Sequence, residues 1–132
     1  ELCRYRLAAK DFLVCGQLLD ELHPQTEVPL ATHLWNRNRP HAAHVPEVMG
    51  TVWRDAAGRL AVFVVNASGS PRRLSFSVDP SAWLGSGGKR AWKASLLTPE
   101  GEQPLGSATQ AEVVLGDLPP RGVRVVLLTP AP

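Results

Sequence analysis

Residues 48–65, with the sequence VMGTVWRDAAGRLAVFVV, decide the fold of this chain. Residues 48–54 are rich in β-branched and aromatic side chains, and residues 60–65 are apolar at every position. Between them, residues 55–58 (DAAG) end on a glycine, which suits a tight turn between two strands. An unbroken apolar run is typical of a strand that is covered on both faces. This stretch therefore predicts a β-hairpin whose second strand lies inside a sheet.

Shorter segments continue the β pattern toward the C-terminus. Residues 73–79 and 92–96 alternate apolar and polar side chains with the period of two that a half-buried strand shows. Residues 112–115 and 123–128 add two more apolar segments, and turns rich in glycine and proline separate them. Six or seven short strands of this kind predict an antiparallel β-sandwich. We expect its core to contain Phe63, Phe76, Trp92, Val113 and Val125.

The first residues of the chain follow a different period. Apolar side chains between residue 2 and about residue 20 recur every three or four positions, which places them on one helical face. Gly16 interrupts this pattern and lowers helix stability by about 1 kcal/mol relative to alanine. Residues 23–47 lose the periodicity, contain four prolines and all four histidines, and predict an irregular connector. The predicted fold is mainly β, an antiparallel β-sandwich preceded by one N-terminal amphipathic helix.

These patterns divide the chain into a terminal helix (residues 1–22), a connector (23–47) and a sandwich domain (48–132). The helix opens with no capping sequence before it, so we expect it to belong to an upstream domain of a longer protein. Its apolar side chains occupy more of the helix circumference than one sandwich face can cover. In the isolated chain we therefore expect self-association through the stripe at Tyr5, Phe12 and Leu19, or a poorly ordered helix.

The composition has no feature of a protein that binds nucleic acid or crosses a membrane. The chain has 132 residues, of which 44% are hydrophobic and 20% are charged, and a formal net charge of +2. This charge is too small to indicate nucleic-acid binding, and no apolar run approaches the roughly 20 residues that span a bilayer. Cys3 and Cys15 would lie about 18 Å apart on the predicted helix, beyond the reach of a disulfide. We expect no disulfide between them and interpret both as buried structural thiols.

The titratable residues do not form a recognisable catalytic or metal site. The four histidines of the connector lack the spacing of a zinc site. Asp11 and Asp20 would lie about 13.5 Å apart along the predicted helix, whereas glycosidase carboxylates lie about 5 to 9 Å apart. Glu100 and Glu102 flank a glycine in a predicted exposed turn, where nothing distinguishes an acid from a base. The sequence therefore predicts no catalytic residue, no metal site and no cofactor.

The four tryptophans are the stronger indication of a ligand surface, because indole rings combine a large apolar face with a polar edge. Trp53 and Trp92 lie among apolar residues of predicted strands, which favours core positions. Trp35 and Trp83 lie in stretches without strand periodicity. These two residues are candidates for contact with a sugar or with a neighbouring domain, and the pattern favours the neighbouring domain.

Residues 66–68 (NAS) match a glycosylation sequon. An asparagine at the start of a turn is explained by the turn itself, so the sequon needs no further explanation.

Four segments carry a resemblance to a known family. Residues 4–16 (RYRLAAKDFLVCG) resemble the last helix of the (β/α)8 barrel in glycoside-hydrolase-like proteins. Residues 52–60 (VWRDAAGRL) and 64–66 (VVN) are similar to the opening hairpin of the β-sandwich that follows such barrels, and residues 118–123 (LPPRGV) resemble its closing strand. The resemblance implies a C-terminal β-sandwich module together with the last barrel helix. Because catalytic carboxylates lie at the ends of barrel strands, it transfers no catalytic residue to this chain.

Two functions of different classes remain. The chain is either a non-catalytic C-terminal module that stabilises or flanks the upstream catalytic barrel of a glycoside hydrolase, or a module that binds carbohydrate or protein through Trp35 and Trp83. The first has the upstream domain of the same chain as its partner, and neither involves nucleic acid or a membrane. A stabilising module should carry a large apolar docking patch and have no affinity for sugars by itself.

Overall fold

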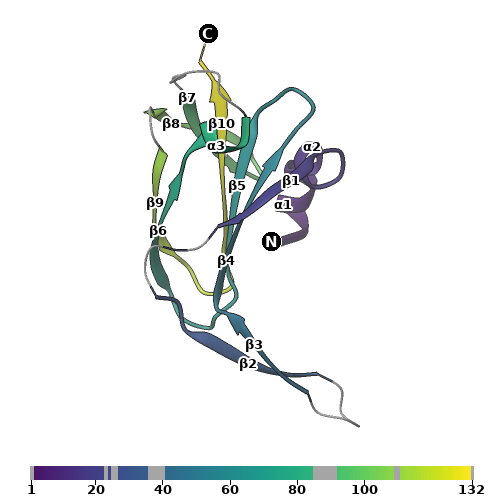
Figure 1. The fold of residues 1–132 in the computed structure, drawn as a ribbon, viewed down its shortest axis with the longest axis vertical. Coiled ribbons are helices and arrows are strands. Elements are labelled where there is room, and N and C mark those ends of the chain that lie inside the picture. Colours follow the sequence, from purple (N-terminus) through teal and green to yellow (C-terminus); the bar gives the residue numbers. More distant parts are fainter. Residues whose placement is uncertain are drawn as a thin grey trace.

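A computed structural model describes residues 2–22, 24, 27–35, 41–84, 92–108 and 111–131 of the chain. Within these residues the chain is mainly β, with three short helices and ten strands (Figure 1). The helices are α1 (Leu2–Ala8), α2 (Lys10–Leu13) and α3 (Pro80–Leu84). The strands are β1 (Gln17–Leu22), β2 (Leu30–Trp35), β3 (His41–Pro46), β4 (Val48–Arg54), β5 (Leu60–Asn66), β6 (Arg72–Val78), β7 (Trp92–Thr98), β8 (Gly101–Ala108), β9 (Ala111–Leu118) and β10 (Val123–Pro130).

Strands β4 and β5 form the hairpin that the sequence predicts. They pair antiparallel, from Val48 opposite Asn66 to Arg54 opposite Leu60. Residues 60–64 of β5 are all buried, as expected of a strand that is covered on both faces. β5 lies inside a six-stranded sheet with the strand order β1–β4–β5–β10–β7–β8, in which every neighbouring pair is antiparallel.

One face of this sheet, which we call the sandwich face, packs against a second layer formed by β6 and β9. These two strands pair with each other in an antiparallel sheet of their own. The core between the layers contains Val52, Val62 and Val126 from the six-stranded sheet, and Val78 and Leu118 from the second layer. All five side chains are at most 2% exposed, so the two layers enclose a continuous apolar core.

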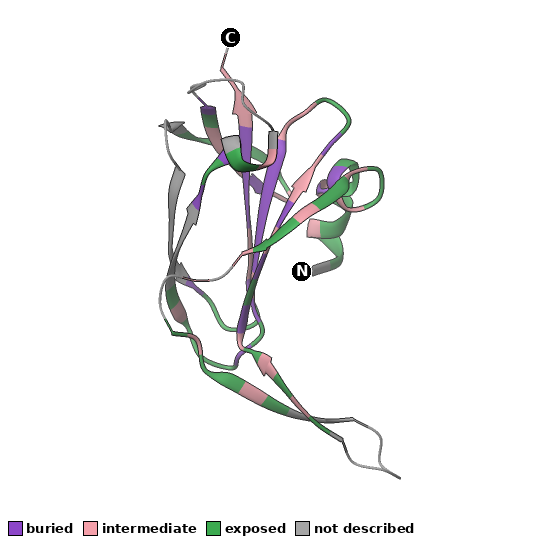
Figure 2. Ribbon diagram, in the orientation of Figure 1, coloured by how far each residue is buried: buried purple, intermediate pink, exposed green. Residues whose placement is uncertain are grey.

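The opposite face, which we call the helix face, is covered in part by α1 and α2 (Figure 2). Its core contains Ala9 and Phe12 from the helical segment and Phe63, Leu97 and Leu127 from the sheet. Because side chains alternate along a strand, neighbouring residues of β5 and β10 belong to the two different cores. The prediction of an antiparallel, mainly β fold with a helical segment at its start is confirmed.

Three of the five predicted core side chains are buried. Phe63 is 8% exposed, Trp92 is 5% exposed and Val125 is fully buried. Phe76 and Val113 lie opposite each other in the pair of β6 and β9, but their side chains lie outside the described residues. The hydrophobic pattern therefore predicted correctly the core positions that can be compared.

The predicted N-terminal helix to about residue 20 is wrong in its second half. Residues 17–22 form β1, which pairs with β4 at the edge of the six-stranded sheet. Gly16 marks the change, because a Cβ atom there would lie 2.4 Å from the carbonyl oxygen of Phe12 and 2.6 Å from that of Arg54. The backbone can approach β4 this closely only without a side chain. The free hydrogen-bonding edge of β4 then outweighs the helical period of this segment.

The predicted irregular connector is also wrong. Strands β2 and β3 pair antiparallel from Leu30 opposite Pro46 to Trp35 opposite His41, and we call this two-stranded sheet the β2–β3 arm. In Figure 1 the arm extends beyond the six-stranded sheet. None of its described side chains is buried. A strand pair without a buried face needs no strict alternation of apolar and polar residues, so the sequence pattern does not reveal it.

Two other elements have no counterpart in the predicted pattern. β8 lies at the edge of the six-stranded sheet, and its first five residues are all exposed. α3 contains Trp83, which therefore lies in a short helix and not in a loop. Among the residues that the structure describes, no helix is long and apolar enough to cross a membrane.

Candidate functional site

The turn between β4 and β5 is held by Asp55. Its Oδ1 accepts a hydrogen bond from the backbone N–H of Arg59 at 2.9 Å, and its Oδ2 accepts one from the Arg59 Nε at 2.6 Å. The backbone N–H of Gly58 donates to the carbonyl oxygen of Asp55, and Gly58 has a φ of 81°, which favours glycine. The Asp55 side chain is 4% exposed. The order Asp-x-x-Gly-Arg in residues 55–59 is therefore explained by the geometry of the turn.

Arg59 also joins this turn to two other segments. Its Nη2 lies 3.8 Å from the Asp11 Oδ2 in α2, and its Nη1 lies 3.6 Å from the Glu102 Oε1 in β8. Its guanidinium carbon lies 5.3 Å from the centre of the Phe12 ring, within the range of a cation–π contact. We call Arg59, Asp11, Phe12, Asp55 and Glu102 the Arg59 cluster.

The carboxylates of the Arg59 cluster do not form a catalytic pair. Asp55 uses both oxygens to hold the turn, whereas the side chains of Asp11 and Glu102 are 60% and 47% exposed. Glycoside hydrolysis needs two carboxyl groups on either side of the scissile bond, one of which acts as an acid. Here a permanently charged guanidinium contacts all three carboxylates. This arrangement joins three segments and leaves no acid and base facing a substrate.

Glu100 and Glu102 enter separate surface contacts. Glu100 pairs with Arg4 of α1 at 2.9 Å, and both side chains are about two-thirds exposed, at 66% and 69%. Glu102 accepts a hydrogen bond from the Ser95 Oγ at 3.1 Å in addition to its contact with Arg59. Both contacts therefore link structural elements to one another.

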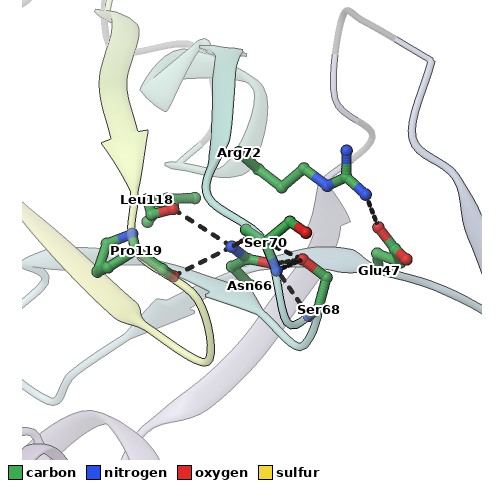
Figure 3. Close-up of polar contacts among 7 residues, drawn as sticks. All are labelled: Glu47, Asn66, Ser68, Ser70, Arg72, Leu118 and Pro119. Carbon is green, nitrogen blue, oxygen red and sulfur yellow. Dashed lines mark hydrogen bonds and ion pairs between the residues drawn. The ribbon is translucent and has the colours of Figure 1, made fainter.

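A second polar cluster joins the turn after β5 to the turn after β9 (Figure 3). Asn66 is fully buried, and its Nδ2 donates hydrogen bonds to the carbonyl oxygens of Ser70 at 2.9 Å, Pro119 at 3.0 Å and Leu118 at 3.3 Å. Its Oδ1 accepts from the backbone N–H of Ser68 at 3.0 Å and from the Ser68 Oγ at 2.7 Å. We call these five residues the Asn66 network. It satisfies both polar atoms of a buried amide.

The Asn66 network explains the glycosylation sequon at residues 66–68. A glycan would be attached at the Nδ2 of Asn66. In the folded chain this atom lies in a fully buried side chain and donates to three carbonyl oxygens. The sequon therefore reflects the hydrogen bonding of the turn, and the folded chain does not present this asparagine for modification.

The base of the β2–β3 arm is attached beside the Asn66 network. Glu47 follows β3 and forms an ion pair with Arg72 of β6 (Figure 3). The backbone N–H of Ala67 donates to the carbonyl oxygen of Glu47 at 2.7 Å, and the backbone N–H of Glu47 donates to that of Pro29 at 2.9 Å. These contacts connect the arm to the turn between β5 and β6.

The two tryptophans singled out in the sequence lie in different settings. Trp83 is half-buried against the core of the sandwich face, and its Nε1 donates to the Asp20 Oδ2 at 3.0 Å. Trp35 lies in β2, but its side chain lies outside the described residues. Trp53 is half-buried at the helix face and donates to the Thr51 Oγ1 at 3.1 Å. A role of Trp35 and Trp83 in ligand or domain contact stays a prediction.

The arm holds one described histidine contact, between the His44 Nδ1 and the Thr32 Oγ1 at 3.2 Å across β2 and β3. Among the described residues, no three His, Cys, Asp or Glu side chains gather in a way that could hold a metal ion. Cys3 and Cys15 are both exposed free thiols, so the prediction that they are buried is wrong. Cys15 lines an open pocket with Arg54 and residues of the β4–β5 turn, in which the Arg54 Nη2 donates to the Gln17 Oε1 at 2.7 Å. No histidine lines this pocket.

The sequence pattern does not predict the Arg59 cluster or the Asn66 network, because the members of each come from segments that are distant in the sequence. The order of residues 55–59 carries a signal for the turn, but nothing local connects it to Asp11 or Glu102. Asn66 was recognised as a turn residue, and only the tertiary structure brings the carbonyl oxygens of Leu118 and Pro119 to it.

Comparisons with known proteins provide a structural likeness. No family model and no curated protein match this chain. A similar solved structure is that of a GH27 β-L-arabinopyranosidase from Geobacillus stearothermophilus, in complex with arabinose, with a TM-score of 0.48 and 23% sequence identity. The likeness covers 65% of this chain and 18% of that enzyme. The chain therefore spans less than a fifth of the enzyme, and the likeness concerns the fold alone.

Proposed function

We propose that this chain is a non-catalytic β-sandwich module that flanks and stabilises an upstream catalytic domain in a glycoside-hydrolase-like protein. The observation that carries the proposal is the exposure of large apolar side chains near the start of the chain. Leu7 in α1 is 71% exposed, and Val14, the residue after the end of α2, is 76% exposed. Leu18 at the start of β1 is 47% exposed. Exposed large apolar side chains that lie close together in the sequence favour a surface that another protein domain covers.

The polar clusters support a structural role. The Arg59 cluster connects the β4–β5 turn to α2 and β8 through the half-buried Arg59 and the buried Asp55, and the Asn66 network connects two turns through the buried Asn66. Neither cluster presents an acid and a base to a cleft. The alternative of a sugar-binding module draws less support, because Trp83 is already engaged by Asp20 and by the sandwich-face core.

The glycoside-hydrolase part of the proposal rests on the resemblance of the sequence segments. Residues 52–60 lie in the β4–β5 hairpin, and residues 118–123 run from the end of β9 through a turn into β10. An opening hairpin and a closing strand are the elements that the resemblance implies for these segments. Residues 4–16, which resemble a last barrel helix, lie in the helical segment that carries Leu7 and Val14.

The test compares the chain alone with the chain extended by whatever polypeptide its gene encodes before Glu1. The chain alone should hydrolyse no chromogenic glycoside. The predicted stripe at Tyr5, Phe12 and Leu19 is not free, because Phe12 is buried against the chain's own sheet. Self-association in sedimentation experiments should therefore occur through the exposed side chains of Leu7 and Val14. The extended protein should turn over a glycoside. Changing Leu7 and Val14 to Glu should lower the melting temperature of the upstream domain and make the isolated chain monomeric, because a charge at each position opposes burial.

The control is Leu30→Glu, because Leu30 is 61% exposed but lies on the β2–β3 arm, which extends beyond the six-stranded sheet (Figure 1). This change should alter neither property. Turnover by the isolated chain that Glu100→Gln or Glu102→Gln abolishes would contradict the proposal. An upstream domain whose melting temperature is the same with and without this chain would contradict it as well.

A further inference from the structure

Residues 2–16, which we call the helical strap, are held to the sheet by few buried side chains. α1 has seven residues and α2 has four, and helices of this length are not stable by themselves in water. No side chain caps the start of α2. Among the described side chains of the helical strap, Ala9 and Phe12 are the buried ones. The helical strap therefore depends on its contacts with the rest of the chain.

Arg59 supplies polar contacts at the point where the helical strap meets the sheet. Its guanidinium lies over the Phe12 ring, the main apolar anchor of the strap, and also contacts Asp11. Asp55 accepts a hydrogen bond from the Arg59 Nε at 2.6 Å, and the Glu102 Oε1 of β8 lies 3.6 Å from the Arg59 Nη1. Because the Asp55 side chain is only 4% exposed, this charge-assisted contact fixes the position of the guanidinium beside the helical strap.

We propose that the contacts of Arg59 with Phe12, Asp11 and Glu102, which we call the clasp, hold the helical strap on the helix face. When these contacts are removed by mutation or weakened by salt, the whole strap detaches while the sheet stays folded. The Arg59 side chain is 30% exposed, and its partners Asp11 and Glu102 are more exposed still. Salt therefore weakens these two contacts. The core of the sandwich face, between the six-stranded sheet and the layer of β6 and β9, contains none of these residues, which separates strap opening from global unfolding.

The state of the clasp determines which apolar side chains of the chain are exposed to solvent. With the clasp closed, Leu7 and Val14 are exposed and the helix face stays covered by Ala9 and Phe12. With the clasp open, Phe63, Leu97 and Leu127 on the helix face lose their cover. This inference concerns the chain by itself and does not rest on the proposed function.

The test measures backbone hydrogen exchange in the folded 132-residue chain. The amides of Leu13, Val14 and Gly16 report on the helical strap, because they donate to the carbonyl oxygens of residues 9, 10 and 12. The amides of β5 and β10 report on the sheet. In the wild-type chain the strap amides should exchange faster than the sheet amides, and raising NaCl from 0.05 to about 0.5 M should accelerate exchange in the strap alone.

Two variants separate the clasp from the turn that Asp55 holds. Arg59→Met keeps an apolar stem on Phe12 but removes the charge, and we expect it to accelerate exchange in the strap about tenfold and to abolish the salt effect. Asp11→Asn together with Glu102→Gln leaves the contact between Arg59 and Asp55 intact, and we expect about threefold faster exchange. Arg72→Met is the matched control, because this arginine also holds a carboxylate and is 32% exposed, but lies at the base of the arm.

Strap amides that keep the wild-type rate in the double variant would overturn the proposal. Salt that accelerates strap and sheet amides equally would overturn it too, because opening would then be global. If Arg59→Met prevents folding, the double variant and the salt dependence of the wild-type chain still decide between a clasp and a merely structural arginine.

Discussion

Replacing Asn66 by Asp should break the connection between the turns that follow β5 and β9. In the wild-type chain the Nδ2 of Asn66 donates to three carbonyl oxygens at 2.9, 3.0 and 3.3 Å. The variant places a carboxylate oxygen against these same acceptors inside a fully buried site. Three lost hydrogen bonds at about 0.5 to 1.5 kcal/mol each give a loss of about 3 kcal/mol. Oxygen facing oxygen without water adds to this loss.

Urea denaturation, followed by tryptophan fluorescence, measures the effect. We expect the free energy of unfolding to fall by about 3 to 5 kcal/mol in Asn66→Asp, a large part of the roughly 5 to 15 kcal/mol of an ordinary domain. Ser68→Ala removes the hydroxyl that donates to the Asn66 Oδ1 and should cost about 1 to 2 kcal/mol. Ser70→Ala is the control, because Ser70 enters the Asn66 network through its backbone carbonyl and N–H groups.

The order of the three variants tests the reasoning more sharply than any single value. Asn66→Asp must be the most destabilising and Ser70→Ala must lie within about 0.5 kcal/mol of the wild type. An Asn66→Asp variant that costs less than about 1 kcal/mol would refute the role of the Asn66 network, since a buried amide with these partners cannot lose them so cheaply.

Two more variants test the packing of the chain. Gly16→Ala should lower the free energy of unfolding by about 1 to 3 kcal/mol, because its Cβ would lie 2.4 Å from a carbonyl oxygen and the backbone must move. Gly69→Ala is the control and should change the urea midpoint little, because nothing lies within 4 Å of the added Cβ. Phe63→Ala should lower the free energy of unfolding by about 3 to 5 kcal/mol in the same assay, because it leaves a cavity in the helix-face core. A loss below about 1 kcal/mol would show that the helical strap does not pack on this ring.

The β4–β5 hairpin could be predicted because its pattern is local. An apolar run in β5, a glycine-ended turn and a β-branched strand before it all favour the same structure, and the tertiary contacts agree with that preference. The burial of Phe63, Trp92 and Val125 followed from the same pattern. The site was less predictable. The sequence gives no signal for the Arg59 cluster, because its members lie in three separate segments, namely α2, the β4–β5 turn and β8.

The sequence by itself determined that this protein is a mainly β chain with an apolar N-terminal segment, because hydrophobic periodicity over five or more residues specifies which side chains face a core. Only the tertiary structure decided where the helix stops and what holds it. Residues 17–22 have a helical period but complete the hydrogen bonds of the β4 edge, which only exists once the sheet has formed. Arg59 likewise meets Asp11, Phe12 and Glu102 only after strands distant in the sequence have paired. Contacts that depend on such pairing carry no local signal, because the groups that make them are brought together only by the tertiary structure.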